Sequence, residues 1–394
     1  MKQDPIVIVN YARTPMGAFD GALATVKSTK LGSVAIEAAL ERSGIEKTDV
    51  DEVIMGAVLS AGLGQAPARQ AAIGAGVPLS ASCTTINKMC GSGMKAIMMA
   101  HDQIMAGTSS VMVAGGMESM TNAPYLLPKA RSGLRMGHAE VKDHMFLDGL
   151  EDAYDQGKLM GFFADATAKK YGFTREDQDA FAIESVKRAQ KAIEEGSFKK
   201  EIASVIIENR KGTTVVGTDE SPLKARLEKI PTLRPAFAKD GTVTAANASS
   251  ISDGAAAVVM MRQSEAEKRG LKPVAKIVAH SSHAHEPAWF TTAPVGAIEK
   301  LFKQTSWTDD DVDLYEINEA FAVVTMAAMK DLNLPHSKVN IHGGACALGH
   351  PIGASGARIV TTLIAALEKV NGKKGIASLC IGGGEAVAVA VEVL

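Results

Sequence analysis

The residue best placed for chemistry is Cys90, in the run Asn-Lys-Met-Cys-Gly-Ser-Gly-Met at residues 87–94. These small residues precede a run typical of a helix that reaches about Ala106. A thiol at a helix N-terminus is favoured as the thiolate, and the free backbone N–H groups there can bind a developing oxyanion. A structural cysteine in a tight turn would give the same pattern, so this segment alone leaves both interpretations open.

His350 lies in a second glycine-rich segment, residues 343–356. Pro351 follows it and restricts the backbone, which suits a loop that presents an imidazole to a cleft. A single histidine is more often structural. An imidazole beside a thiol raises the thiolate fraction, so proximity to Cys90 would make His350 catalytic.

Cys380 ends an apolar run and is followed by Ile-Gly-Gly-Gly at residues 381–384. A thiol has an unperturbed pKa of about 8.5, so it can transfer protons near neutral pH. A cysteine buried in the core is the alternative, and this segment alone favours it.

Asn318 follows an apolar run at residues 314–317 that predicts a strand, and it opens the sequence Asn-Glu-Ala-Phe-Ala. An amide at a strand end can hold a water or donate to an oxyanion. It can equally cap the helix that follows.

An internal repeat relates these segments. Each copy predicts strand, helix, strand, helix, strand, and residues 111–116 and 377–384 are matching apolar strands that end in glycines. This alternation favours α/β layers in two similar halves, and it places His350 near the repeat equivalent of Cys90. The matching pairs are Ile36-Glu37 with Ile298-Glu299, Asp49-Val50-Asp51 with Asp311-Val312-Asp313, and Ser92-Gly93 with Ser355-Gly356.

Charged residues concentrate between the two copies, which indicates an inserted, more solvated subdomain. Within it, Thr174 to Asp177 has the pattern of a capping box and predicts a surface helix that stops at Gly196. We therefore expect a first half of residues 1–120 and 246–270, an insertion of residues 121–245, and a second half of residues 271–394.

The composition narrows the class of protein. The 394 residues are 46% hydrophobic and 22% charged, with a net charge of -2, so we expect neither disorder nor a nucleic-acid partner. The longest uncharged stretches contain too many Gly, Pro, Asn, Thr and His residues for lipid-facing helices. With no leader pattern after Met1 and no paired spacing among the four cysteines, we expect a cytoplasmic protein without membrane contact or disulfides.

Together these segments resemble the thiolase family from Ile6 to the C-terminus. The resemblance implies a five-layer αβαβα fold of two duplicated βαβ-type halves. It also implies that the insertion is a CoA-binding loop domain and that the chain forms a homotetramer, a dimer of dimers. Four motifs carry the resemblance: Cys-x-Ser-Gly at Cys90, Asn-Glu-Ala-Phe at Asn318, Gly-His-Pro at His350 and Cys-x-Gly-Gly-Gly at Cys380.

The resemblance implies a ping-pong acyltransferase that condenses two acetyl-CoA to acetoacetyl-CoA and CoA, and that catalyses the reverse thiolysis. Cys90 would carry the acyl group, His350 would assist its deprotonation, and Cys380 would remove an α-proton from the second acyl-CoA. One oxyanion hole would combine His350 with a water held by Asn318, and the other the N–H groups at Cys90 and Gly382. No cofactor is implied, because the coenzyme A thioesters are substrates.

The resemblance also indicates residues around the acyl and pantetheine end, for which core packing is the alternative: Ser249, Met160, Phe237, Phe290 and Phe321. Leu159 stands where short-chain members often have histidine, which leaves the preferred chain length open. The alternative function is a broader 3-ketoacyl-CoA thiolase of fatty acid β-oxidation. Cys346 also departs from the family pattern, and we interpret it as packing.

Rival functions account for parts of the sequence. A divalent metal would need His280, His283, His285 and Glu286 to converge, but their spacing favours an ordinary strand-to-loop segment and no metal site. A ketosynthase or hydroxymethylglutaryl-CoA synthase would use an active cysteine without Cys380 as a base. An inactive acyl-CoA or lipid carrier would keep only the scaffold.

Overall fold

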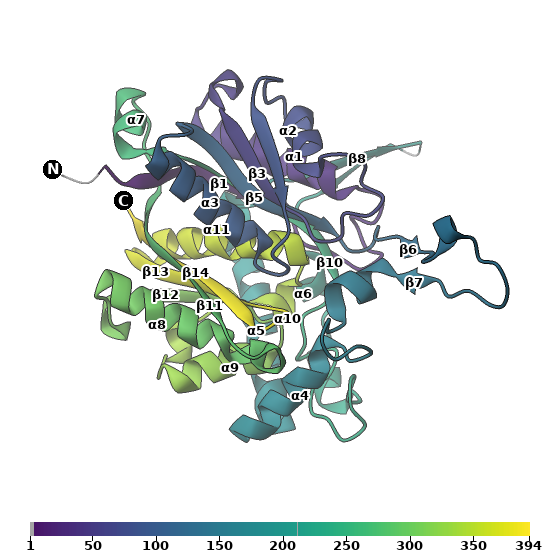
Figure 1. Ribbon diagram of the computed structural model, residues 1–394. Helices are drawn as coiled ribbons and strands as arrows, with labels where there is room; N and C mark the ends of the chain where they lie inside the picture. Colours follow the sequence, from purple (N-terminus) through teal and green to yellow (C-terminus); the bar gives the residue numbers. More distant parts are fainter. Residues whose placement is uncertain (1–3, 211) are drawn as a thin grey trace.

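Five layers alternate between helices and sheet in the computed structural model, which describes residues 4–210 and 212–394 (Figure 1). This arrangement confirms the αβαβα prediction. Each sheet carries helices on both faces, and the central layer is a pair of helices shared by the two halves.

The first half contains a sheet of order β4-β3-β5-β10-β1, with a short strand β2 paired to β10. β3 runs parallel to β4 and β5, whereas β10 runs antiparallel to β5 and β1. Helices α1 and α2 cover its outer face and α3 covers its inner face. The bounds are β1 Ile6–Arg13, β2 Gly17–Ala18, α1 Ser28–Ser43, β3 Glu52–Gly56, α2 Pro67–Gly74, β4 Ser82–Ile86, α3 Ser92–Ala106, β5 Val111–Ser119 and β10 Ser252–Arg262.

The second half repeats this plan with the strand order β12-β13-β14-β11. α8 and α9 lie outside, and α11 packs against α3 in the central layer. Pairing of Val7 with Lys276 and of Ile8 with Ala275 joins the two sheets. The bounds are β11 Ala275–Ala284, α8 Ala293–Thr305, β12 Leu314–Ile317, α9 Ala322–Asp331, α10 Ala345–Leu348, α11 Ile352–Val370, β13 Lys374–Ile381 and β14 Glu385–Val393.

Matching hydrogen bonds confirm the internal repeat. Asp51 accepts bonds through Oδ2 from the backbone N–H groups of Ser110 (2.8 Å) and Val111 (2.9 Å), where β5 begins. Asp313 does the same for Lys373 (2.7 Å) and Lys374 (2.9 Å), where β13 begins. The repeated aspartates therefore fix equivalent strands in the two halves.

The predicted strand ending at residue 116 is wrong, because β5 continues through the glycines to Ser119. A Cβ on Gly115 would lie 2.1 Å from the Ala256 oxygen, and one on Gly116 would lie 2.0 Å from the Gly353 oxygen. Glycine here permits close packing inside the strand. In the second half, by contrast, β13 stops at Ile381 and the glycines form the turn.

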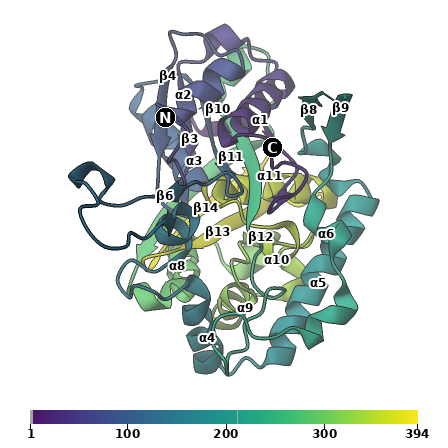
Figure 2. The ribbon, with the colours of Figure 1, turned by 90° about the vertical axis from the view of Figure 1, so that its right-hand side faces the viewer.

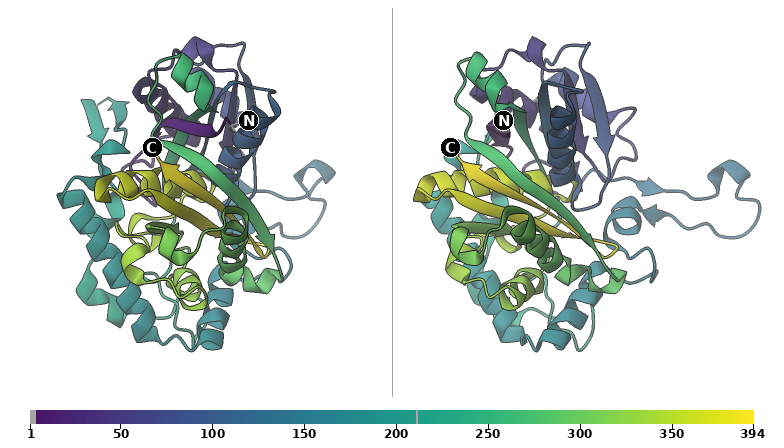
Figure 3. Two further views of the ribbon diagram at one scale, coloured as in Figure 1. Left: turned by 90° about the vertical axis from the view of Figure 1, so that its left-hand side faces the viewer. Right: turned by 60° about the vertical axis from the view of Figure 1, so that its left-hand side comes forward.

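Between β5 and β10 the chain wraps around the second half and then returns to the first half, where its β8–β9 hairpin packs beside α1 (Figures 2 and 3). The capping box at Thr174 and Asp177 is present, and the helix that it predicted is confirmed as α5. A buried Arg13 holds Glu201 and Asp219 of this segment at 2.8 and 2.7 Å. The remaining elements are β6 Tyr125–Leu126, β7 Lys142–Asp143, a π-helix Phe146–Leu150, α4 Met160–Tyr171, α5 Arg175–Glu194, β8 Val205–Asn209, β9 Gly212–Val216, α6 Glu220–Lys224 and, after β10, α7 Gln263–Lys268.

The longest helices within residues 4–210 and 212–394 are α5, with 20 residues, and α11, with 19 residues. None of those described combines the length and the apolar character that crossing a membrane requires. Even α11, which is buried from Ile352 to Leu367, is covered by the two sheets.

Candidate active site

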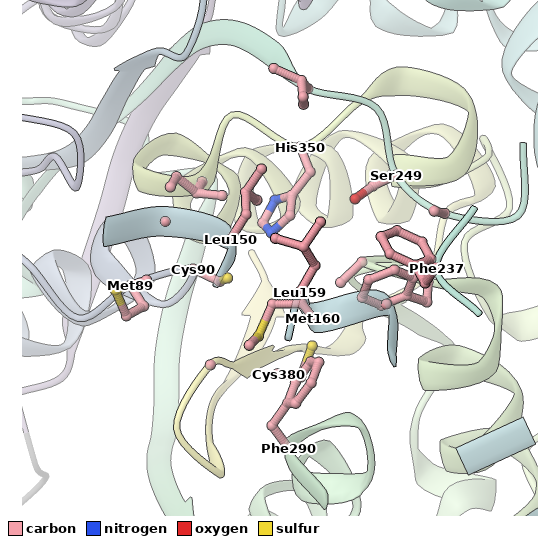
Figure 4. A pocket seen from close by; sticks show the side chains of 18 of the residues that line it. Met89, Cys90, Leu150, Leu159, Met160, Phe237, Ser249, Phe290, His350 and Cys380 are labelled. Atoms are coloured by element: carbon pink, nitrogen blue, oxygen red, sulfur yellow. The ribbon is translucent and has the colours of Figure 1, made fainter. Parts of the chain in front are cut away.

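Cys90, His350 and Cys380 line one pocket, to which both halves and the insertion contribute (Figure 4). Gly382 lines it too. The sequence-predicted catalytic groups are therefore brought together, apart from Asn318, which lies outside the pocket lining as the described residues define it.

The loop before α3 holds Cys90 in a constrained geometry. Met89 has a φ of 46°, in the left-handed region that a non-glycine residue adopts at a cost. Ser92 fixes the loop because its hydroxyl donates to the Met89 oxygen (2.6 Å) and accepts from the Lys88 N–H (2.8 Å). A Cβ on Gly91 would lie 2.5 Å from Ile381 Cδ1, so glycine lets this loop approach the end of β13.

Burial raises the pKa of the Cys90 thiol to about 11, and the backbone N–H groups of Gly382 and Cys90 itself oppose this rise through hydrogen bonds to the sulfur. The backbone N–H groups therefore favour the thiolate, as expected from sequence, but the loss of hydration outweighs them and the resting thiol is neutral. The two N–H groups nevertheless converge on the sulfur. They would serve equally for an oxyanion formed on a group attached there.

His350 is oriented by Ser355 on the first turn of α11. Its Nδ1 lies 2.6 Å from Ser355 Oγ, and that hydroxyl donates to the Pro351 oxygen at 2.9 Å. Because the hydroxyl proton is used in that bond, we assign the imidazole proton to Nδ1. Nε2 then carries the lone pair, and it has no hydrogen-bond partner among the described residues.

Burial and, to a smaller extent, the nearby Arg358 guanidinium together lower the pKa of His350 to about 3. The imidazole is therefore neutral at physiological pH. A neutral ring with a free Nε2 can accept a proton from a neighbouring thiol.

Cys380 lies on β13, fully buried in a cluster that includes Phe290 and Phe321. Burial raises the pKa of its thiol well above the ordinary value, and the proximity of Cys90 raises it further. The unperturbed value assumed from sequence is thus wrong for this site. Cys380 rests as a neutral thiol and must lose its proton before it can act as a base.

Asn318 is buried, and neither its Oδ1 nor its Nδ2 has a hydrogen-bond partner within residues 4–210 and 212–394. The capping alternative is wrong, because α9 begins at Ala322 and Phe321 occupies its N-cap position. A buried amide without partners is rare and costly, and it indicates a bound water or ligand. Its backbone N–H donates to the Ser378 oxygen at 3.0 Å, two residues before Cys380.

All five residues predicted around the acyl and pantetheine end line the same pocket. Ser249, Met160, Phe237, Phe290 and Phe321 line it, and the rings of Phe237 and Phe321 meet edge to face at 6.0 Å. Leu159 also lines it, at the N-cap of α4. Cys346 is elsewhere, with its sulfur 3.6 Å from the Asn247 oxygen, which agrees with a packing role.

Several apolar lining residues were missed from sequence, because nothing in their type or spacing separates them from core residues. A cysteine-containing motif can be recognised, whereas an isoleucine before a helix cannot. The missed residues are Met89, Phe146, Gly149, Leu150, Gly161, Ala248, Ile251, Ala320 and Ile352.

The sequence matches two family models that together span nearly all of the chain. The model described as thiolase, N-terminal domain, covers residues 6–264, and thiolase, C-terminal domain, covers residues 271–393. The chain belongs to the thiolase family.

Relatives in this family are similar over almost their whole length. The chain is 50% identical to an acetyl-CoA acetyltransferase of Cupriavidus necator, over 98% of this chain and 99% of that protein. It is 50% identical to acetyl-CoA acetyltransferase 2 of Arabidopsis thaliana, over 99% and 97%. The crystal structure of Acat5 thiolase from Ascaris suum in complex with coenzyme A superposes with a TM-score of 0.93 at 43% identity, over 99% and 100%.

Proposed function

We propose that this thiolase is an acetyl-CoA C-acetyltransferase, which condenses two acetyl-CoA to acetoacetyl-CoA and CoA and catalyses the reverse thiolysis. The observation that carries the proposal is the arrangement at Cys90. The Cys90 sulfur faces two backbone N–H groups. The thiol of Cys380 and the neutral imidazole of His350 line the same pocket, and His350 Nε2 has no hydrogen-bond partner among the described residues.

In the first step, Cys90 Sγ attacks the thioester carbonyl while His350 Nε2 takes the thiol proton. The carbonyl oxygen becomes an oxyanion, and the N–H groups of Cys90 and Gly382 stabilise it. Each such donor contributes about 3 to 4 kcal/mol to lowering the barrier. When the carbonyl reforms, the CoA thiolate leaves and takes a proton from Cys380, so acetyl-Cys90, a protonated His350 and a Cys380 thiolate remain.

In the second step, the Cys380 thiolate removes an α-proton from another acetyl-CoA. The enolate oxygen is stabilised by the Nε2–H of His350 and by a water that Asn318 holds. The enolate carbon attacks acetyl-Cys90, and expulsion of the Cys90 thiolate yields acetoacetyl-CoA. That thiolate recovers the proton from His350, which restores the resting site.

The preference for a short acyl chain is supported by the lining and by the relatives. The aromatic side chains of Phe237, Phe290 and Phe321 line the pocket together with Met160, and the relatives described above carry acetyl-CoA acetyltransferase names. These names favour the short-chain function over a broader 3-ketoacyl-CoA thiolase. Comparing thiolysis rates of acetoacetyl-CoA and longer 3-oxoacyl-CoA tests this, and rates that rise with chain length would contradict it.

The insertion, residues 121–245, supplies Leu159, Met160 and Phe237 to the pocket, which supports its assignment as the CoA-binding domain. Between β6 and β7 it extends away from the body (Figure 1). The side chain of Met136 there is 97% exposed, and Leu134 and Val141 are exposed beside it. Such apolar exposure supports a homotetramer in which these segments meet. Replacing Met136 with Glu should lower the mass measured by light scattering.

All four cysteines are free thiols, which supports the expected cytoplasmic location. The same thiols allow the central test. Replacing Cys380 with Ser should abolish condensation. Acetylation of Cys90, measured as a mass increase of the intact protein, should become slower but still occur, because the CoA thiolate can leave without the Cys380 proton. Cys83 to Ser is the control. Near-normal condensation without Cys380 would favour a decarboxylating synthase, and absence of acetylation would favour a carrier.

A further inference from the structure

The two histidines of β11, His280 and His283, lie on opposite faces of the strand and do not form one metal-binding cluster. His283 faces α8, since a Cβ on Gly296 would lie 2.4 Å from the His283 ring. Ser281 faces the same side, because its hydroxyl donates to the Ala297 oxygen at 2.7 Å. His280 lies on the opposite face, as strand alternation requires. It is therefore separated from His283 and directed toward α3.

On that face His280 meets two residues of the first half. His280 Nε2 lies 2.9 Å from Asp102 Oδ1, and His101 Nδ1 lies 3.2 Å from the same oxygen. The two imidazole rings meet edge to face with their centroids 5.0 Å apart. Two ring nitrogens and one carboxylate oxygen thus converge at the C-terminal part of α3, with all three ligand atoms within 4.8 Å of one another.

The two nitrogen–oxygen separations, 2.9 and 3.2 Å, are close to those between ligands of a metal site. Zinc binds imidazole nitrogen and carboxylate oxygen at about 2.0 to 2.2 Å, which places tetrahedral ligands about 3.3 to 3.5 Å apart. The two nitrogen–oxygen distances need to change by only a few tenths of an ångström.

We propose that His101, Asp102 and His280 bind a divalent transition-metal ion such as Zn²⁺, with a fourth position open to solvent. The side chains of His101 and His280 are 18% and 19% exposed and that of Asp102 is 57% exposed, so an ion can enter from solution. Since the ligands come from α3 and β11, the ion would cross-link the two halves. None of these three residues is among the described residues that line the pocket of Cys90.

Zn²⁺ titration of the full chain by calorimetry tests the site, together with His280→Gln, His101→Gln and His283→Gln. The last is the control on the opposite face of β11. We expect one ion per chain in the wild type and in His283→Gln, and an affinity about tenfold or more weaker in the other two. Zn²⁺ should raise the Tm only where the cluster is intact. Equal affinity in the wild type and both cluster variants would overturn the proposal.

Catalytic thiols also bind zinc, so the same titration is made with Co²⁺. Nitrogen and oxygen ligands give only weak visible bands, whereas thiolate ligation adds intense ultraviolet charge-transfer absorption. A weak visible spectrum that disappears in His280→Gln and His101→Gln supports the site. A thiolate spectrum that survives both substitutions would assign binding to the cysteines and overturn the proposal. Circular dichroism without metal verifies that each variant is folded.

Discussion

The start of α3 and the start of α11 are equivalent positions in the two halves, and each carries a serine whose hydroxyl fixes a neighbouring segment of the pocket. Ser92 ties its hydroxyl to the loop that carries Cys90, through Lys88 and Met89. Ser355 ties its hydroxyl to Pro351 and to the ring of His350. Duplication has kept the anchor and changed the group that it holds. In the proposed mechanism, one half therefore presents the nucleophile and the other presents its base.

The strand ends show the same contrast. The ladders pair Glu52 with Met112 in the first half and Leu314 with Gly375 in the second, so Gly56 corresponds to Asn318. A Cβ on Gly56 would lie 2.6 Å from the Ser92 backbone, which excludes a larger residue there. The second half has room for an amide at that position. At equivalent backbone positions, close packing therefore restricts the first half to glycine, whereas the second half accommodates a polar side chain.

Replacing Cys90 with Ala should give the largest effect, since it removes the only nucleophile proposed for the first half. We expect kcat for thiolysis to fall by about 10⁴-fold or more. The steady-state rate with acetoacetyl-CoA measures it. Cys83 to Ala, on β4, is the matched control and should retain activity. Substantial turnover without the Cys90 thiol would mean that the two halves do not divide the work as described.

Replacing Asn318 with Ala should lower kcat by about 10² to 10³-fold, because the water that it holds in the proposed mechanism would be lost as an oxyanion donor. The side-chain amide of Asn318 has no hydrogen-bond partner among the described residues, so the thermal stability of the variant should be unchanged or higher. Thermal unfolding and kinetics measured on the same preparation separate these effects. A lower Tm with unchanged kcat would make Asn318 structural.

Replacing each of the two serines, Ser92 and Ser355, with alanine compares the two anchoring hydroxyls directly. Ser355 to Ala frees the His350 ring and should lower kcat by about tenfold to a hundredfold, with little change in KM. Ser92 to Ala should instead mainly lower the Tm, because it releases the strained loop at Met89. Equal kinetic losses in the two variants would show that both serines act only through packing.

The pH dependence of alkylation should sharpen the electrostatic part of the comparison. With a pKa of about 11 for Cys90, the thiolate fraction rises tenfold per pH unit across the neutral range. Iodoacetamide labelling of Cys90, followed by peptide mass spectrometry, should therefore accelerate steadily between about pH 7 and 9. A plateau below pH 8 would indicate a preformed thiolate paired with imidazolium.

The sequence was most informative where a local pattern decides the structure. The capping box at Thr174 and Asp177 specifies the start of α5, and the repeated aspartates Asp51 and Asp313 mark matching strands. Cysteine and histidine motifs predicted three residues that line one pocket, Cys90, His350 and Cys380, because those residue types are rare and chemically distinct.

Other properties depend on packing that no short segment records. The pKa of Cys90 rises because tertiary burial removes its hydration, which outweighs its favourable position before α3. Ile251 and Ile352 have the composition of core residues, and only the assembled fold exposes them to the pocket. His280 meets Asp102 because the two halves pack together, although the residues are far apart in the chain.

The position of β10 has a consequence for synthesis of the chain. Both ladder partners of β1 in the described structure, β10 and β11, follow the insertion in the sequence. At about 5 to 20 residues per second, a ribosome takes roughly 10 to 50 s to reach β10 after completing β1. During this time the apolar first strand has no partner edge. The first half, although encoded first, can therefore complete its sheet only after the insertion has emerged.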